Sequence, residues 1–226
     1  AGAYLGLDVQ KLNVDLFALG AHKFYGPKGV GVLYVRSGTP LLSALTGGGQ
    51  ESGLRAGTHN VPYIAGMAEA LKIAQAKRSL LLSHVTPLRD LIIQRVLSDI
   101  PHSRLTGHPS LRLPNHASFA FEGVDGNALL MHLDTAGFAC SSGSACKTGS
   151  PEPSEVLTAL GLNRAWALGS LRVTLGRYSN QEEIELFLAT LPGQVERLVG
   201  EAVAAQRCAV AGGIHPADAG EVNTIG

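Results

Sequence analysis

The stretch Gly20 to Gly31, GAHKFYGPKGVG, organises the first part of the chain. Apolar runs flank it, Val14 to Leu19 before and Val30 to Val35 after, which predicts two strands joined through a glycine-proline turn. Lys23 stands where the first strand enters the turn, and we expect it to be poorly solvated there. Because poor solvation favours the neutral amine, Lys23 is a candidate for a Schiff base with a carbonyl cofactor. The alternative is that Lys23 and Lys28 are ordinary solvated lysines of a β-turn.

Composition narrows the classes of protein that this chain can belong to. It has 226 residues, of which 45% are hydrophobic and 16% charged, with a formal net charge of zero. The hydrophobic fraction is enough for a sizeable core. The zero net charge gives no electrostatic reason to expect binding to nucleic acid or to an anionic membrane. Three cysteines argue against a disulfide framework, and no apolar run reaches the length of a membrane span. The sequence predicts a cytoplasmic protein without nucleic-acid or membrane partners.

Hydrophobic periodicity predicts alternating strands and helices along the rest of the chain, and hence an α/β protein. A domain boundary is expected near Ser79, with a βαβ-like pattern before it and an α+β layer after it. A tail from about Cys208 is expected to be disordered or loosely docked. The predicted elements are a helix after Pro62, a helix carrying Val85 to Val96, a strand over Ala117 to Phe121, a helix capped by Asp125, a strand over Phe138 to Cys140, a helix from Ser154 to Gly161, a strand over Leu171 to Leu175, and a long helix opening at Asn180 and Glu183.

The loop Ser141 to Ser150 consists of small and polar residues around one cysteine, Cys146. Its neighbours are too small to bury the thiol, and Lys147 beside it favours the thiolate, so Cys146 is a candidate nucleophile. An incidental surface cysteine is the alternative. Cys140 is interpreted as a buried strand residue, and the spacing of the two cysteines excludes a CxxC redox or zinc motif.

Two further residues are candidates for binding groups. Arg172 alternates with apolar neighbours in its predicted strand, so its planar guanidinium should point away from the core, where it could hold a carboxylate. An arginine on the surface of an edge strand is the alternative. Thr58 lies in a glycine-flanked loop whose hydroxyl and backbone donors suit a phosphate, although such a loop is a weakly specific signal.

Four ordered segments, AHKFYGPKGVGVLYVR, GGGQESGLRAGTHNVP, SSGSACKTG and GSLRVTLGRYSNQEEI, together resemble the NifS/IscS-like cysteine desulfurases of the class V aminotransferase family. The resemblance extends to about Val199 and implies a pyridoxal-phosphate enzyme of fold type I. It implies the C-terminal portion only, with the later part of the cofactor-binding large domain at 1–79, a small C-terminal domain at 80–207 and a tail at 208–226.

The resemblance also implies roles for individual residues. Lys23 matches the Schiff-base lysine, and His22 matches a residue that hydrogen-bonds the cofactor phosphate. Thr58 matches a threonine that reaches the phosphate of the other subunit's cofactor, which implies a homodimer. Cys146 matches the nucleophile that becomes a persulfide, and it is also a candidate transient ligand of an iron–sulfur cluster. Arg172 matches the arginine that holds the substrate carboxylate.

The implied reaction takes sulfur from L-cysteine, leaves L-alanine and delivers the sulfur to an acceptor such as an iron–sulfur scaffold protein. The sequence departs from the family at Gly20, where a phosphate-binding serine is usual. The family's aspartate, glutamine and stacking histidine around the cofactor ring are expected upstream of Ala1. Two alternatives stay open: a non-catalytic module that dimerises or binds the acceptor, and a related selenocysteine lyase.

Overall fold

A computed structural model describes residues 2–142 and 152–211 of the chain. The chain divides into two compact units, residues 1–83 and 84–226. The division falls inside a helix, a few residues beyond the boundary expected near Ser79. Across the described ranges, no helix is both long and apolar enough to cross a membrane.

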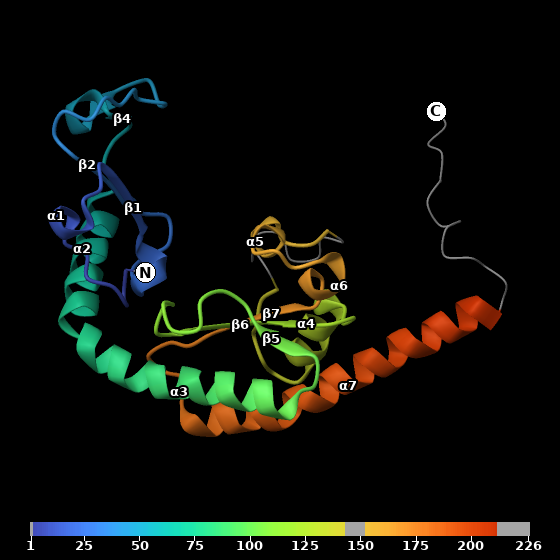
Figure 1. Cartoon of the computed structure of the whole chain (residues 1–226). Helices are drawn as coiled ribbons and strands as arrows, with labels where there is room; N and C mark the ends of the chain where they lie inside the picture. The colour runs from blue at the N-terminus through green and yellow to red at the C-terminus, as the bar shows by residue number, and fades with distance from the viewer. Residues whose placement is uncertain (1, 143–151, 212–226) are drawn as a thin grey trace, which may run out of the picture. The chain divides into compact units, whose positions relative to one another are not determined.

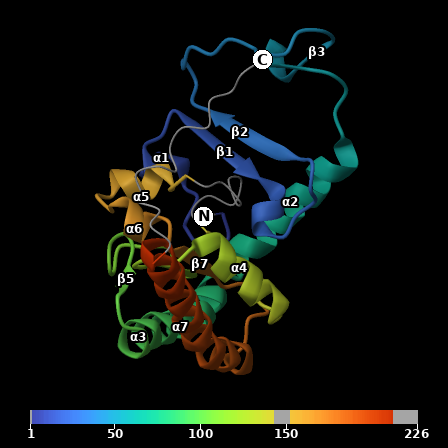
Figure 2. The same ribbon diagram turned by 90° about the vertical axis from the view of Figure 1, so that its right-hand side faces the viewer.

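The first unit is built from a two-stranded sheet, a small exposed hairpin and one long helix (Figure 1). Strands β1 and β2 lie along helix α2 in both views of the ribbon (Figures 1 and 2). The elements are α1 (Val9–Leu12), β1 (Leu16–Gly20), the 3-10 helix η1 (Ala21–Phe24), β2 (Gly31–Val35), β3 (Gly49–Gln50), the 3-10 helix η2 (Glu51–Gly53), β4 (Arg55–Ala56) and α2 (Val61–Ala76).

The two predicted strands around the glycine-proline turn are confirmed, but the βαβ-like arrangement is wrong. Strands β1 and β2 pair antiparallel, with Leu16 opposite Val35 and Gly20 opposite Gly31. A Cβ at Gly31 would stand 2.8 Å from the Leu19 carbonyl oxygen, so only glycine permits this close pairing. A turn this short returns the chain beside itself, whereas a parallel pair needs a long crossover.

The turn itself packs against α2 through small residues. A Cβ at Gly26 would stand 3.2 Å from the Ala70 Cβ, and one at Gly66 would stand 3.0 Å from the ring of Pro27. The glycine-proline turn and α2 therefore fit each other closely, and this contact sets the position of η1 within the unit.

The second unit contains a three-stranded antiparallel sheet in the order β5-β6-β7. Helices α4 and α7 contact each other, and α4 also contacts β7. Helix α3 crosses the division between the units. The elements are α3 (Arg78–Asp99), β5 (Ser103–Leu105), β6 (His116–Phe121), α4 (Gly126–Thr135), α5 (Glu155–Ala159), α6 (Arg164–Ala167), β7 (Ser170–Thr174) and α7 (Gln181–Ala211).

The sheet of the second unit has one apolar and one polar face. Directly opposed residues share a face, and the register pairs Ala117 with Val173 and Phe119 with Leu171. These four side chains are at most 8% exposed, and they face a core that includes Leu133 and the apolar side of α7. The residues that alternate with them in β6 and β7, among them Ser118 and Arg172, lie on the opposite, polar face.

Capping bonds confirm two of the predicted helix starts in this unit, whereas Ser154 precedes α5 without a side-chain capping bond. The Asp125 carboxylate accepts from the backbone N–H of Asn127 at 2.8 Å. At the start of α7, the Glu183 N–H donates to Asn180 Oδ1 at 2.9 Å, and the Asn180 N–H donates to Glu183 Oε2 at 3.3 Å. This reciprocal pair is the capping box that the spacing predicts.

Two other expectations for this unit are wrong. Residues 138–140 form no strand, and the chain pairs with the sheet only at Ser141, through an isolated bridge to Arg172. Helix α7 continues through Pro192 to Ala211, so the described chain is still helical at Cys208, where the tail was expected to begin. The remainder of the expected tail lies outside the described residues.

Gly169 is required for the join between α6 and β7, and we predict that Gly169→Ala is strongly destabilising. An added Cβ would collide with the Phe121 carbonyl oxygen, which belongs to the neighbouring strand and cannot move independently. We expect a loss of about 2 to 3 kcal/mol in the free energy of unfolding, measured by urea titration. Gly200→Ala is the matched control: nothing lies within 4 Å of its Cβ, and in helix α7 alanine should gain up to about 1 kcal/mol. Equal midpoints for both variants would contradict the prediction.

Candidate functional site

Lys23 and His22 lie on the outer side of η1. Residues three apart in a 3-10 helix share a side, and here Ala21 and Phe24 take the inner side at 0% and 1% exposure. His22 and Lys23 are consequently exposed. The expectation that Lys23 is poorly solvated is therefore wrong for the described structure, because the short turn sends Phe24 into the core in its place.

Gly20 leaves space for the His22 ring. A Cβ at position 20 would stand 3.2 Å from His22 Cε1 and 3.4 Å from Nδ1, closer than an ordinary contact. A serine at this position would press on the imidazole. The predicted residues thus lie together at the end of β1, with His22 and Lys23 exposed and Gly20 partly exposed.

Thr58 is exposed and lies two residues beyond β4, just after the hairpin that β3 and β4 form. Two successive non-glycine residues, Glu51 and Ser52, have φ angles of 52° and 56°, which is a costly conformation for side-chain-bearing residues. Leu42 and Leu45 are 93% and 63% exposed. Exposed leucines beside a tightly bent hairpin are typical of a surface that another chain covers.

Arg172 lies on the polar face of the second unit's sheet, as its alternation predicts. The register places it directly opposite Ser118 on β6, and its side chain is half-buried. Its two neighbours in the strand, Leu171 and Val173, point into the core. The backbone that carries the guanidinium is therefore fixed by a packed strand.

The base of the cysteine loop is joined to the strand that carries Arg172. The Arg172 N–H donates to the Ser141 carbonyl at 2.6 Å, and the Ser141 N–H donates to the Arg172 carbonyl at 3.2 Å. The Ser142 and Ser170 hydroxyls are 2.9 Å apart, and Ser170 is 3% exposed. A Cβ at Gly126 would stand 3.1 Å from Ser142 Oγ, so the first turn of α4 also packs closely against the base of the loop. Cys146 and Lys147 themselves lie outside the described residues.

Cys140 is a poorer candidate nucleophile than Cys146. It is a free cysteine, and burial raises the pKa of its thiol to about 11. At neutral pH nearly all of it is the thiol rather than the reactive thiolate. Cys140 is half-buried and lies outside any strand, so the interpretation of it as a buried strand residue is wrong.

The polar face of the sheet also carries residues that the sequence reasoning did not identify as part of a site. His116 pairs with Thr174, and the Thr106 hydroxyl donates to Ser118 Oγ at 2.8 Å. The signal was present in the sequence, because His116 and Ser118 alternate with the apolar residues of the predicted strand. They share the face of Arg172.

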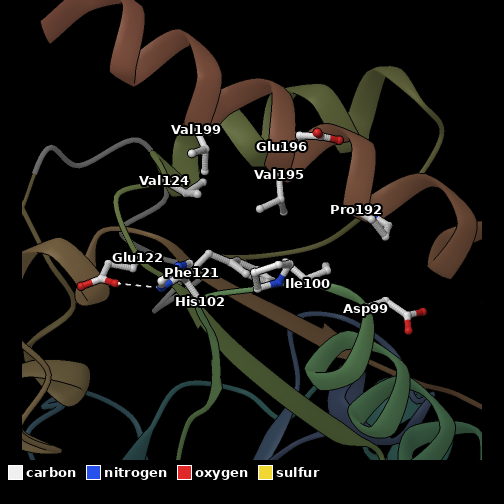
Figure 3. Close-up of a pocket in the computed structure, with 11 residues that line it drawn as sticks. Asp99, Ile100, His102, Phe121, Glu122, Val124, Pro192, Val195, Glu196 and Val199 are labelled. Carbon is white, nitrogen blue, oxygen red and sulfur yellow. Dashed lines mark ion pairs between the residues drawn. The ribbon is translucent and has the colours of Figure 1, made fainter.

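A cavity of about 470 Å³ lies elsewhere in the second unit, between α7 and the ends of α3 and β6 (Figure 3). Val195 and Val199 line it from α7, facing Ile100 and Phe121. Of the predicted site residues that the structure describes, none lines this cavity. Within 2–142 and 152–211, no cluster of three or more histidine, cysteine or acidic side chains could hold a metal ion.

Known proteins similar to this chain are consistent with the resemblance. Residues 4–187 match the family described as Aminotransferase class-V. "Cysteine desulfurase IscS 1" of Archaeoglobus fulgidus is 43% identical over 192 residues, which cover 85% of this chain and 50% of that protein. "Cysteine desulfurase NifS" of Azotobacter vinelandii is 41% identical over 192 residues, covering 85% and 48%.

Solved structures give the same result. A protein titled "NIFS-LIKE PROTEIN" superposes with a TM-score of 0.76 at 34% identity, covering 87% of this chain and 50% of that one. A NifS-like protein from Rickettsia africae gives a TM-score of 0.78 at 25% identity, covering 87% and 51%. The chain spans about half the length of the curated relatives that it matches. Since the family match extends over most of its residues, the chain belongs to the aminotransferase class-V family.

Proposed function

We propose that this chain takes part in a pyridoxal-phosphate-dependent cysteine desulfurase, which converts L-cysteine to L-alanine and holds the removed sulfur on Cys146. The observation that carries the proposal is the main-chain pairing of Ser141 with Arg172. It fixes the start of the cysteine loop to the strand that presents the predicted carboxylate-binding arginine. The segment that carries the predicted nucleophile therefore starts beside the strand of the predicted substrate anchor, as the proposed chemistry needs.

The residues at the end of β1 fit the cofactor that this family uses. Lys23 offers an exposed primary amine for the aldehyde, and the exposed imidazole of His22 offers a hydrogen-bond donor for the phosphate. Gly20 leaves the imidazole its space. When bound, pyridoxal phosphate supplies the electron sink that makes bonds around the substrate's α-carbon labile.

The remaining roles belong to Arg172, Lys23 and Cys146. Arg172 holds the substrate carboxylate, and the Lys23 amine moves protons at the α-carbon and the β-carbon. The Cys146 thiolate attacks the substrate sulfur; the new S–S bond forms as the substrate's C–S bond breaks. The carbon keeps the electron pair of that bond and takes a proton. L-Alanine leaves, and Cys146 keeps the persulfide for an acceptor protein.

Thr58 supports a homodimer as the working form. It is exposed just after β4, and Leu42 and Leu45 are exposed just before β3, so a second copy that covers these leucines would receive Thr58 at its own cofactor phosphate. Sedimentation of the holoenzyme should give a dimer. A monomer that keeps full activity would contradict this part of the proposal.

The function is tested by incubating the holoenzyme with L-cysteine and a thiol reductant. We expect L-alanine and sulfide in equal amounts, because each turnover makes one of each. Protein that retains pyridoxal phosphate yet forms neither product would overturn the proposal. Alanine formed without sulfide would overturn the persulfide step.

Arg172→Lys should raise the KM for L-cysteine by about tenfold to a hundredfold, because a point charge replaces a planar group that binds a carboxylate through two hydrogen bonds. Steady-state kinetics with L-cysteine would measure it. Arg164→Lys is the control: Arg164 pairs with Glu152 at 3.1 Å on the surface and should leave the KM unchanged. Equal KM values for the two variants would remove Arg172 from the substrate site.

A further inference from the structure

His116 lies beside Arg172 on the polar face of the second unit's sheet. Ser118 is directly opposite Arg172, and His116 is opposite Thr174, so His116 and Arg172 are diagonal cross-strand neighbours on one face. Diagonal neighbours have backbones roughly 7 to 8 Å apart, which long and ring side chains span. Both residues are half-buried on rigid strands rather than on loops.

The surroundings of His116 keep its imidazole neutral. Burial lowers its pKa from the usual value, and the positive charges of Arg112 and Arg172 lower it further. Arg112 is held in place by three backbone carbonyls, those of Thr106, His108 and His116. A neutral imidazole has one N–H donor and one acceptor nitrogen, so it can form a hydrogen bond to a carboxylate without competing with Arg172 for charge.

We propose that His116 is a second contact for the substrate carboxylate, donating a hydrogen bond to an oxygen that Arg172 leaves available. The proposal rests on the proposed function, in which Arg172 holds that carboxylate. A carboxylate accepts about four hydrogen bonds and a guanidinium fork uses two of them. A donor at the side of the fork therefore restrains rotation of the carboxylate. His116 is in this sense a residue that orients the substrate.

Binding should also be linked to protons. The substrate carboxylate brings a negative charge next to His116, which offsets the effect of Arg112 and Arg172 and raises the imidazole pKa in the complex. The bound form then takes up a proton more readily than the free form, so affinity should increase as the pH falls between the two pKa values. Among the described residues, Arg104 on β5 also lies on this face, opposite Ala120, and its guanidinium stacks on the Trp166 ring. Arg89 and Asp90 on α3 lie near Arg112 and form a 2.7 Å ion pair with each other.

The test compares His116→Leu and His116→Asn in the holoenzyme, with His102→Asn as the matched control. We expect His116→Leu to raise the KM for L-cysteine about tenfold with kcat changed less than about twofold, as for one lost hydrogen bond to a charged group. His116→Asn, which keeps a donor, should recover most of the KM but lose its dependence on pH. His102, an exposed residue paired with Glu122 at 3.4 Å, should be replaceable without effect.

A second measurement does not depend on turnover or on a variant that folds. Titrating the wild-type holoenzyme with L-alanine, which carries the same carboxylate, should shift the His116 imidazole NMR signals towards the protonated form. If the wild type turns over L-cysteine but His116→Leu has an unchanged KM, this inference alone is overturned. The same holds if the His116 signals do not move when L-alanine is added. Wild-type holoenzyme without turnover would instead overturn the proposed function.

Discussion

Cys146→Ala is expected to abolish sulfide release from L-cysteine, with a loss of activity on the order of a thousandfold or more. The reason is that the proposal assigns acceptance of the substrate sulfur, as a persulfide, to the Cys146 thiol. Because the variant removes only the thiol, binding of pyridoxal phosphate and of L-cysteine should be retained. Sulfide and alanine assays measure the loss of activity, and the absorbance spectrum of the bound cofactor measures the retained binding.

Cys140→Ala provides the matched control for that result. Cys140 is six residues earlier in the chain, but burial raises the pKa of its thiol to about 11, so it cannot supply a thiolate at neutral pH. Its loss should leave the rate of sulfide release within about twofold of the wild type. If Cys140→Ala lost activity and Cys146→Ala kept it, the assignment of the persulfide would be wrong.

Most of the longer helices of this protein could be predicted because their signals are local, whereas the four-residue helices α1 and α6 were not predicted. The capping pair of Asn180 and Glu183 and the cap at Asp125 lie within one turn of the residues they bond, so sequence spacing specifies them. The alternation in β6 and β7 likewise separated the core residues Phe119 and Leu171 from the polar face. Signals of this kind depend on neighbours along the chain.

The remaining features depend on contacts that sequence periodicity does not specify. Apolar runs beside a turn predict β1 and β2 as strands but do not give their relative direction. Residues 138–140 are apolar enough for a strand, yet only Ser141 meets a partner, Arg172, more than thirty positions away. The exposure of Lys23 follows from the three-residue period of η1, which places Ala21 and Phe24 inwards. That period was visible in the sequence, and it predicts exposure more reliably than the apolar run before the turn.

Lys23→Ala is expected to remove the covalent attachment of pyridoxal phosphate and to reduce desulfurase activity by on the order of a thousandfold or more. Lys23 is the only lysine of η1, and it follows β1 directly, so its amine is held by a short turn whose inner residues are buried. Borohydride reduction of the holoenzyme followed by peptide mass spectrometry should place the cofactor on Lys23 in the wild type and nowhere in the variant. Lys23→Arg should behave like Lys23→Ala, because it keeps the charge but has no amine that can form a Schiff base.

Lys28→Ala distinguishes the chemistry of Lys23 from a general effect of removing a lysine from the turn. Lys28 is exposed between Pro27 and Gly29 of the same connection, so its loss changes the charge of the turn by the same amount. Activity and cofactor content should remain within about twofold of the wild type, because an exposed turn side chain contributes little to stability. Cofactor recovered on Lys28 or on another lysine of the wild type would show that the exposed amine at the end of β1 is an ordinary surface lysine, the alternative that its sequence surroundings left open.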